Sequence, residues 1–143
     1  MIFELDLDMR TMAERLISAY PQEFGHIEFD RVLFYQEITG EPDKGGSAAR
    51  CRKIQPIFRQ ALADAGVEAD WIIEFYSAAT ADKGERWLAI LMFHELRHIG
   101  FDGKLVKHDL EDFIQVLQLA GILWYTTEEK DLPDIITEKL LAV

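Results

Sequence analysis

Residues 94–98 read HELRH, two histidines four apart with a glutamate directly after the first. In a helix, residues four apart lie on one face, one turn above the other, so both imidazoles can face one metal ion. Zinc binds neutral imidazole nitrogens at about 2.0–2.1 Å. Glu95 then lies to one side of the pair, where its carboxylate can take a proton from a water that the metal activates. The spacing therefore predicts a zinc site with its own catalytic base.

The same residue types near a helix end can also form an ordinary solvated surface. The segment before the motif argues against this, since residues 87–93 (WLAILMF) are apolar on every face and predict a buried helix. Two ionisable histidines next to such a helix are costly without a partner. We therefore favour the metal site, while short motifs of this kind also arise by chance.

A catalytic zinc needs a third protein ligand and one open position. Of the four histidines, His26 precedes a predicted strand in an unhelpful context, whereas His108 follows a glycine-containing turn that can fold the chain back. We choose His108, and Asp109 and Asp112 are its rivals. Asp112 lies four residues after His108 and could instead hold a ligand histidine through its second ring nitrogen. Asp109 could be a helix N-terminal carboxylate with no catalytic meaning.

The composition restricts the class of protein. A formal net charge of −11, from 26 acidic and 15 basic residues, argues against binding to nucleic acid or to an anionic membrane. The single cysteine, Cys51, excludes an intrachain disulfide and a thiolate zinc cluster, and it favours a reducing compartment. We see no signal peptide and no membrane-length apolar run. We expect one cytoplasmic domain over residues 1–143.

Hydrophobic periodicity predicts an α+β fold, with one small mixed or antiparallel sheet packed against helices and the motif on a buried helix. Thr80 or Asp82 should cap that helix, and Gly100 and Gly103 should end it. Residues 39–50 should form a loop. The expected strands are 29–38, 51–54 and 71–78, and the other expected helices are 8–19, 56–65, 108–119 and a short one within 131–143.

Four stretches together resemble the family of putative phage metallopeptidases, small HExxH proteins of phages and prophages. They are HELRHIG (94–100), KHDLEDF (107–113), CRKI (51–54) and WIIEFY (71–76), and the resemblance runs from the first expected helix through Phe113. HExxH alone would be moderate evidence, and its combination with KHDLEDF after a short turn is more specific.

The resemblance implies a zincin-like fold, a zinc ion and peptide-bond hydrolysis in a bacterial or phage-infected cell. It assigns His94 and His98 as ligands and Glu95 as the catalytic residue, and it names no substrate beyond protein or peptide. The HExxHxxGxxH extension of metzincins is absent, since Lys104 occupies its last position. This excludes the third-ligand geometry of that class.

In the mechanism that we expect, Glu95 takes a proton from water as general base and passes it to the leaving amine. Tyr76, Tyr125 and Arg97 are candidates for a further donor to the oxyanion. The strand at 71–78 either pairs with an extended substrate at a sheet edge or is ordinary sheet core. The basic stretch at 44–59 either recognises an acidic partner or is a solvated loop and strand edge.

Two other functions compete with a zinc-dependent metallopeptidase. One is a zinc-stabilised, non-catalytic interaction domain, in which a glutamate beside the first ligand would have no purpose. The other is a YbeY-like metal-dependent ribonuclease, whose three histidines also begin with HxxxH but follow each other more closely. The acidic charge disfavours an RNA substrate. The sequence leaves the oligomeric state open.

Overall fold

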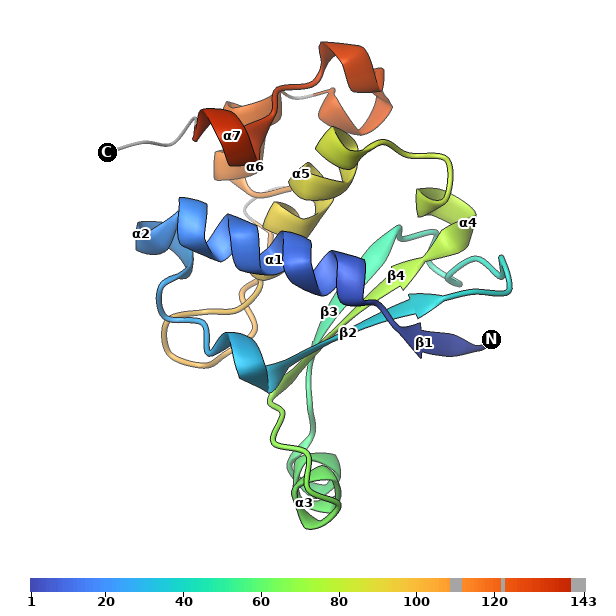
Figure 1. Cartoon of the computed structure of the whole chain (residues 1–143), viewed down its shortest axis with the longest axis vertical. Helices are drawn as coiled ribbons and strands as arrows, with labels where there is room; N and C mark the ends of the chain where they lie inside the picture. Colours follow the sequence, from blue (N-terminus) through green and yellow to red (C-terminus); the bar gives the residue numbers. More distant parts are fainter. Residues whose placement is uncertain (109–111, 122, 140–143) are drawn as a thin grey trace.

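The computed structural model describes residues 1–108, 112–121 and 123–139, which form an α+β fold as expected (Figure 1). The strands are β1 (Phe3–Leu5), β2 (Val32–Glu37), β3 (Ala49–Lys53) and β4 (Trp71–Tyr76). The helices are α1 (Leu7–Ala19), α2 (Pro21–Phe24), α3 (Pro56–Asp64), α4 (Ser77–Thr80), α5 (Glu85–Leu96), α6 (Ile114–Ala120) and α7 (Ile135–Glu138). Short 3₁₀ turns are η1 (Phe29–Arg31), η2 (Trp124–Thr126) and η3 (Glu129–Asp131). Within these described parts, no helix is long and apolar enough to cross a membrane.

The four strands form one mixed sheet in the order β1-β2-β4-β3. β2 and β4 run parallel, whereas β1 is antiparallel to β2 and β3 is antiparallel to β4. β4 is therefore an interior strand, and the hypothesis that 71–78 offers its edge to a substrate is wrong. Its apolar sequence, WIIEFY, suits a strand that has neighbours on both sides. The edge beside α5 belongs to β3.

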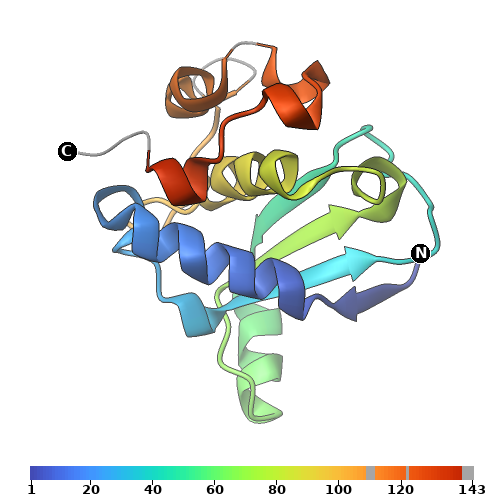
Figure 2. The same ribbon diagram turned by 45° about the horizontal axis from the view of Figure 1, so that its top comes forward.

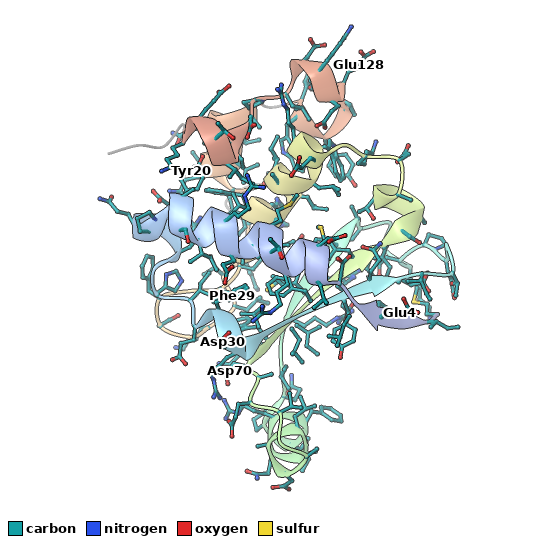
Figure 3. The ribbon with its side chains drawn as sticks, viewed as in Figure 1. Glu4, Tyr20, Phe29, Asp30, Asp70 and Glu128 are labelled. Carbon is teal, nitrogen blue, oxygen red and sulfur yellow. The ribbon has the colours of Figure 1, made fainter. Side chains whose placement is uncertain are left out.

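Helices α1 and α5 lie side by side over one face of the sheet (Figures 1 and 2). Asp6 caps the N-terminus of α1 through its carboxylate, which accepts the N–H of Met9, and the helix buries the face that contains Met12 and Leu16. At its other end, the Tyr20 hydroxyl donates to the carbonyl of Ile135 in α7 (Figure 3). This contact joins the C-terminal helices to the first helix.

The helix that carries the motif is buried, as its all-apolar sequence predicted. Eight residues of α5 are buried, and Ile90, Met92, Phe93 and Leu96 are fully inaccessible. Neither Thr80 nor Asp82 caps it, because the N-cap is Gly84, which has no side chain. The cap comes instead from the C-terminal segment.

Glu129, in η3, supplies this cap across a long stretch of sequence. Its two carboxylate oxygens accept the backbone N–H groups of Arg86 at 2.7 Å and Trp87 at 3.0 Å. These N–H groups have no partner inside the helix, and a negative charge at a helix N-terminus is favourable. Thr80 is used elsewhere, since its hydroxyl donates to the Tyr76 carbonyl within α4.

Several predicted boundaries differ from the observed ones. The strand expected at 29–38 begins as η1 and becomes β2 only at Val32, and the strand expected at 51–54 begins at Ala49. The strand expected at 71–78 ends at Tyr76, and α4 begins at Ser77. β1 was not predicted, because three residues carry too little periodicity. The short last helix is α7, and 140–143 lie outside the described residues.

Among the described residues, the helix expected at 108–119 is observed as α6, which begins at Ile114, and 109–111 lie outside the described residues. Phe113 precedes it with extended backbone angles, φ −77° and ψ 138°. The Phe113 ring is fully buried, and the extended backbone lets it reach its position beneath the histidines. Burial of this side chain outweighs the local helical periodicity.

Candidate metal centre

His94 and His98 occupy the end of α5. His94 lies in the last turn of the helix, which ends at Leu96. His98 follows in a tightened turn, because its N–H donates to the carbonyl of Glu95, three residues earlier, at 3.1 Å. Both imidazoles thus remain on the same side of the helix, with their ring centroids 5.4 Å apart.

A tight turn brings His108 back to this pair. Ile99 and Leu105 form an isolated antiparallel bridge, and the N–H of Val106 donates to the carbonyl of His98 at 2.7 Å. Gly103, inside the turn, has a φ of +76°, a conformation that favours glycine. The glycine-containing turn therefore reverses the chain as the sequence indicated.

The three histidines direct the same ring nitrogen at one point. Nε2 of His108 lies 2.7 Å from Nε2 of His94 and 3.0 Å from Nε2 of His98. Within the described parts of the chain, these three form a group whose possible ligand atoms all lie within 4.8 Å of one another. Around a tetrahedral zinc ion, neighbouring nitrogens are separated by about 3.3 Å, so a small outward shift of the rings would admit the ion.

The second ring nitrogens fix the tautomers of the first two histidines. Nδ1 of His98 lies 2.6 Å from the carbonyl oxygen of Val106, and a carbonyl can only accept, so this Nδ1 carries the proton. Burial lowers the pKa of His98 to about 4, which keeps the ring neutral at pH 7. Its Nε2 therefore presents a lone pair, the form that binds a metal ion.

Asp112 plays the same part for His94. Its Oδ1 lies 2.6 Å from Nδ1 of His94 and accepts the N–H of Phe113, while Oδ2 accepts the indole N–H of Trp124 at 2.6 Å. Burial opposes the charge of Asp112, but the hydrogen bonds from His94 and Trp124 outweigh it and lower the pKa of the carboxyl. Asp112 thus holds a histidine and is not itself in the group of ligand atoms. Asp109, the other rival, lies outside the described residues.

The ring of Phe113 packs against all three histidines of the cluster. Its ring centroid lies 5.4 Å from that of His94, 4.9 Å from that of His98 and 5.3 Å from that of His108, each at a steep angle. The guanidinium of Arg97 lies 5.0 Å from the same ring. Edge-to-face contacts of this kind favour one orientation of each imidazole. Sequence reasoning missed this role, because Phe113 looked like one apolar position of a helix.

Glu95 is buried beside the histidines, with 3% of its surface exposed. Burial raises the pKa of its carboxyl to about 7, with a further contribution from the charge of Asp112 and opposition from His94. A hydrogen bond from the backbone N–H of Cys51, on β3, also opposes this rise in pKa. Oε2 of Glu95 makes no hydrogen bond to the residues that the structure describes. A carboxyl with this pKa can both accept and return a proton near neutral pH.

The cluster opens into a cavity of about 1160 Å³ between β3, α5 and the C-terminal segment. Its walls include Cys51, Leu91, Leu117, Trp124 and Tyr125. Ligand sites of this size bury most of a small ligand or of several peptide residues.

Access to the cavity distinguishes the three candidate donors to an oxyanion. Tyr125 lines the cavity. Tyr76 is buried and its hydroxyl donates to Glu74 at 2.8 Å, and Arg97 stacks on Phe113. Tyr125 is therefore the candidate with access to the site. His26 lies apart from the cluster, where its Nε2 is 2.7 Å from the carbonyl oxygen of Ile99.

An α+β fold with three histidines around one point is that of a candidate metalloprotein, and comparison with known families agrees. The family model described as "Putative phage metallopeptidase" matches residues 1–138, and the chain belongs to this family. The search of curated proteins and the search of solved structures gave no match. The family name implies a metal, and the three histidines are residues that could bind one.

Proposed function

We propose that this protein is a zinc-dependent metallopeptidase with His94, His98 and His108 as zinc ligands and Glu95 as general base. The observation that carries the proposal is the convergence of three Nε2 atoms beside the buried carboxylate of Glu95. Three imidazoles and an open side suit catalytic zinc better than Mg²⁺ or Ca²⁺, which prefer oxygen ligands.

Zinc bound at this point would supply a Lewis acid that polarises the peptide carbonyl and activates water for attack. Glu95 takes the proton from the attacking water and passes it to the leaving amine. Asp112 and the Val106 carbonyl keep two imidazoles in the orientation and tautomer that the site needs. Tyr125 lines the cavity, and we propose it as the donor to the developing oxyanion.

The edge of β3 supports binding of an extended peptide. Tyr76 N–H donates to the carbonyl of Ala48, and Ile54 N–H donates to the carbonyl of Asp70, so even-numbered residues bond to β4. In an antiparallel ladder the alternate residues point their backbone groups away. The backbone N–H and C=O groups of Ala49, Cys51 and Lys53 therefore point toward the cavity, where the Cys51 N–H meets the Glu95 carboxylate and the other groups could pair with a substrate strand.

The test compares Glu95→Gln with the unchanged protein, using Glu128→Gln as a matched control at the exposed surface (Figure 3). Removal of the general base should lower kcat by about 10²- to 10⁴-fold, while zinc content stays near one ion per chain. A randomised decapeptide library, read by mass spectrometry, serves as substrate.

Three outcomes distinguish the alternatives. Loss of cleavage in Glu95→Gln alone, with zinc retained, supports the proposal. Zinc binding without cleavage of any peptide by the unchanged protein would instead favour a zinc-stabilised, non-catalytic domain. No bound metal after preparation with zinc would contradict both.

A further inference from the structure

Two arginines on β3 lie on the face of the sheet that is opposite to α5. In the register of β3 with β4, Cys51 is paired with the fully buried Ile73, whereas Arg50 is paired with Glu74 and Arg52 with Ile72. Side chains alternate between the faces of a strand. Cys51 therefore faces α5, and the two arginines flank it on the other face.

Both arginines line the cavity that contains the histidines. The side chain of Arg50 is 37% exposed and that of Arg52 is 54% exposed, so a ligand at the edge of β3 can reach both.

Acidic partners from the protein orient both guanidinium groups. Asp43 accepts from Nε and Nη2 of Arg50 at 2.9 and 2.7 Å, and Glu74 accepts from Nε of Arg52 at 2.9 Å. The bonds from Arg50 hold the pKa of Asp43 well below its usual range, so this pair persists across the neutral range. An arginine has five N–H groups. Among the described residues, Nη1 of Arg50 donates to no acceptor. Such arginines can bind a second carboxylate without first losing much side-chain freedom.

The charge of the rest of the molecule makes this edge distinctive. The chain has a formal net charge of −11, so its general field repels an acidic ligand. Lys53, at the end of β3, adds a third cation on the wall of the same cavity, and its ammonium donates to the Gly103 carbonyl at 2.7 Å. The basic strand thus offers an acidic peptide one favourable line of approach, along β3.

We propose that the substrate is an acidic peptide segment that adds to β3 as a further strand and places carboxylate side chains opposite Arg50 and Arg52. Because those residues are two apart, the acidic positions in the substrate are separated by one residue. The side chain between them lies on the α5 side, opposite Cys51, toward Glu95. This inference rests on the proposed peptidase function and specifies its substrate class.

The size of the effect follows from cross-strand pairs. Directly opposite side chains on neighbouring strands lie close enough for charge pairs to contribute, and two such pairs together correspond to about two- to thirty-fold in affinity. Because both guanidinium groups are partly exposed, the preference should shrink as salt is raised from about 0.05 to 0.5 M.

The experiment uses pairs of fluorescein-labelled decapeptides. Their sequences come from library peptides that the protein cleaves, or from arbitrary extended sequences if it cleaves none. Within each pair, one peptide contains Asp-Xaa-Asp and the other contains Asn-Xaa-Asn at the same position. Further pairs place this triplet at successive positions along the decapeptide. Binding to zinc-loaded Glu95→Gln is measured by fluorescence anisotropy, and kcat/KM is measured with the unchanged protein.

We expect the Asp peptide to bind more tightly at one position of the triplet. This ratio should fall toward one in Arg52→Gln, persist in Arg52→Lys, and stay unchanged in the control Arg59→Gln, whose guanidinium pairs with Asp70 outside the cavity. Equal binding of both peptides at every position would overturn the inference, as would an equal loss in Arg59→Gln.

Binding separates this inference from the proposed function. Cleavage without any preference for Asp contradicts the inference and leaves the peptidase proposal intact. Preferential binding without cleavage of any peptide contradicts the peptidase proposal and keeps the basic edge as a site for acidic peptides.

Discussion

Replacement of Asp112 by asparagine tests whether this carboxylate tunes the metal site or only joins two segments. The substitution keeps the size of the side chain but removes its charge and one of its two acceptor oxygens. Oδ1 serves His94 and the Phe113 N–H, and Oδ2 serves the Trp124 indole. An asparagine oxygen can occupy only one of these two places.

The magnitude follows from the bonds that are lost. Loss of a hydrogen-bonding partner behind a metal-binding histidine typically weakens metal affinity by about 10- to 100-fold. If the amide oxygen stays with His94, the amide N–H₂ faces the Trp124 N–H, and leaving such a donor unsatisfied costs about 1–3 kcal/mol. We therefore expect the Kd for zinc to rise about 10- to 100-fold and the free energy of unfolding of the zinc-free protein to fall by about 1–3 kcal/mol.

Two measurements separate these effects. Competition with a chromophoric chelator gives the Kd for zinc, and urea unfolding after chelator treatment gives the stability without metal. Asp30→Asn is the matched control, since the Asp30 side chain is 90% exposed and pairs with Arg10 at the surface. A Kd for Asp112→Asn within about threefold of the unchanged protein, together with reduced stability, would show that Asp112 is only a structural link and refute the reasoning.

Three further results are expected. His108→Ala should weaken zinc binding strongly, as measured by the same competition, and an unchanged Kd would remove His108 from the ligand set. Glu129→Gln should lower the free energy of unfolding by about 0.5–2 kcal/mol, because it weakens the cap of α5; equal stability in urea would contradict this role. Burial opposes the charge of Glu37, but hydrogen bonds from Ile2 and Thr39 prevail and lower its pKa to about 2. The stabilisation by Glu37 is thus complete above its ordinary pKa of 4.5 and is lost as the pH falls through about 2. The melting temperature should fall over this range, and the fall should be smaller in Glu37→Gln.

The local parts of the site could be predicted from sequence. The spacing of His94 and His98 depends only on helix geometry, and the burial of α5 follows from its uninterrupted apolar run. The turn that returns His108 was visible in its glycines, because a positive φ at Gly103 is a local requirement. Each of these features involves residues close together in the chain.

The remaining features depend on contacts between distant segments. The cap of α5 lies more than forty residues after the helix starts, at Glu129. The interior position of β4 is set by the order of the strands, which composition does not determine. Phe113 leaves the predicted helix because its ring packs beneath three histidines that come together only in the folded chain.

The segment after the glycine turn holds α5 near both ends, through Asp112 at His94 and through Glu129 at Arg86 and Trp87. Along the helix axis these two points of attachment are about 12 Å apart, eight residues at about 1.5 Å each. The chain between Asp112 and Glu129 thus has to match a fixed distance, and it also carries Trp124 and Tyr125 of the cavity wall. Insertions or deletions should accordingly be tolerated less well between these two carboxylates than in the exposed loop before β3.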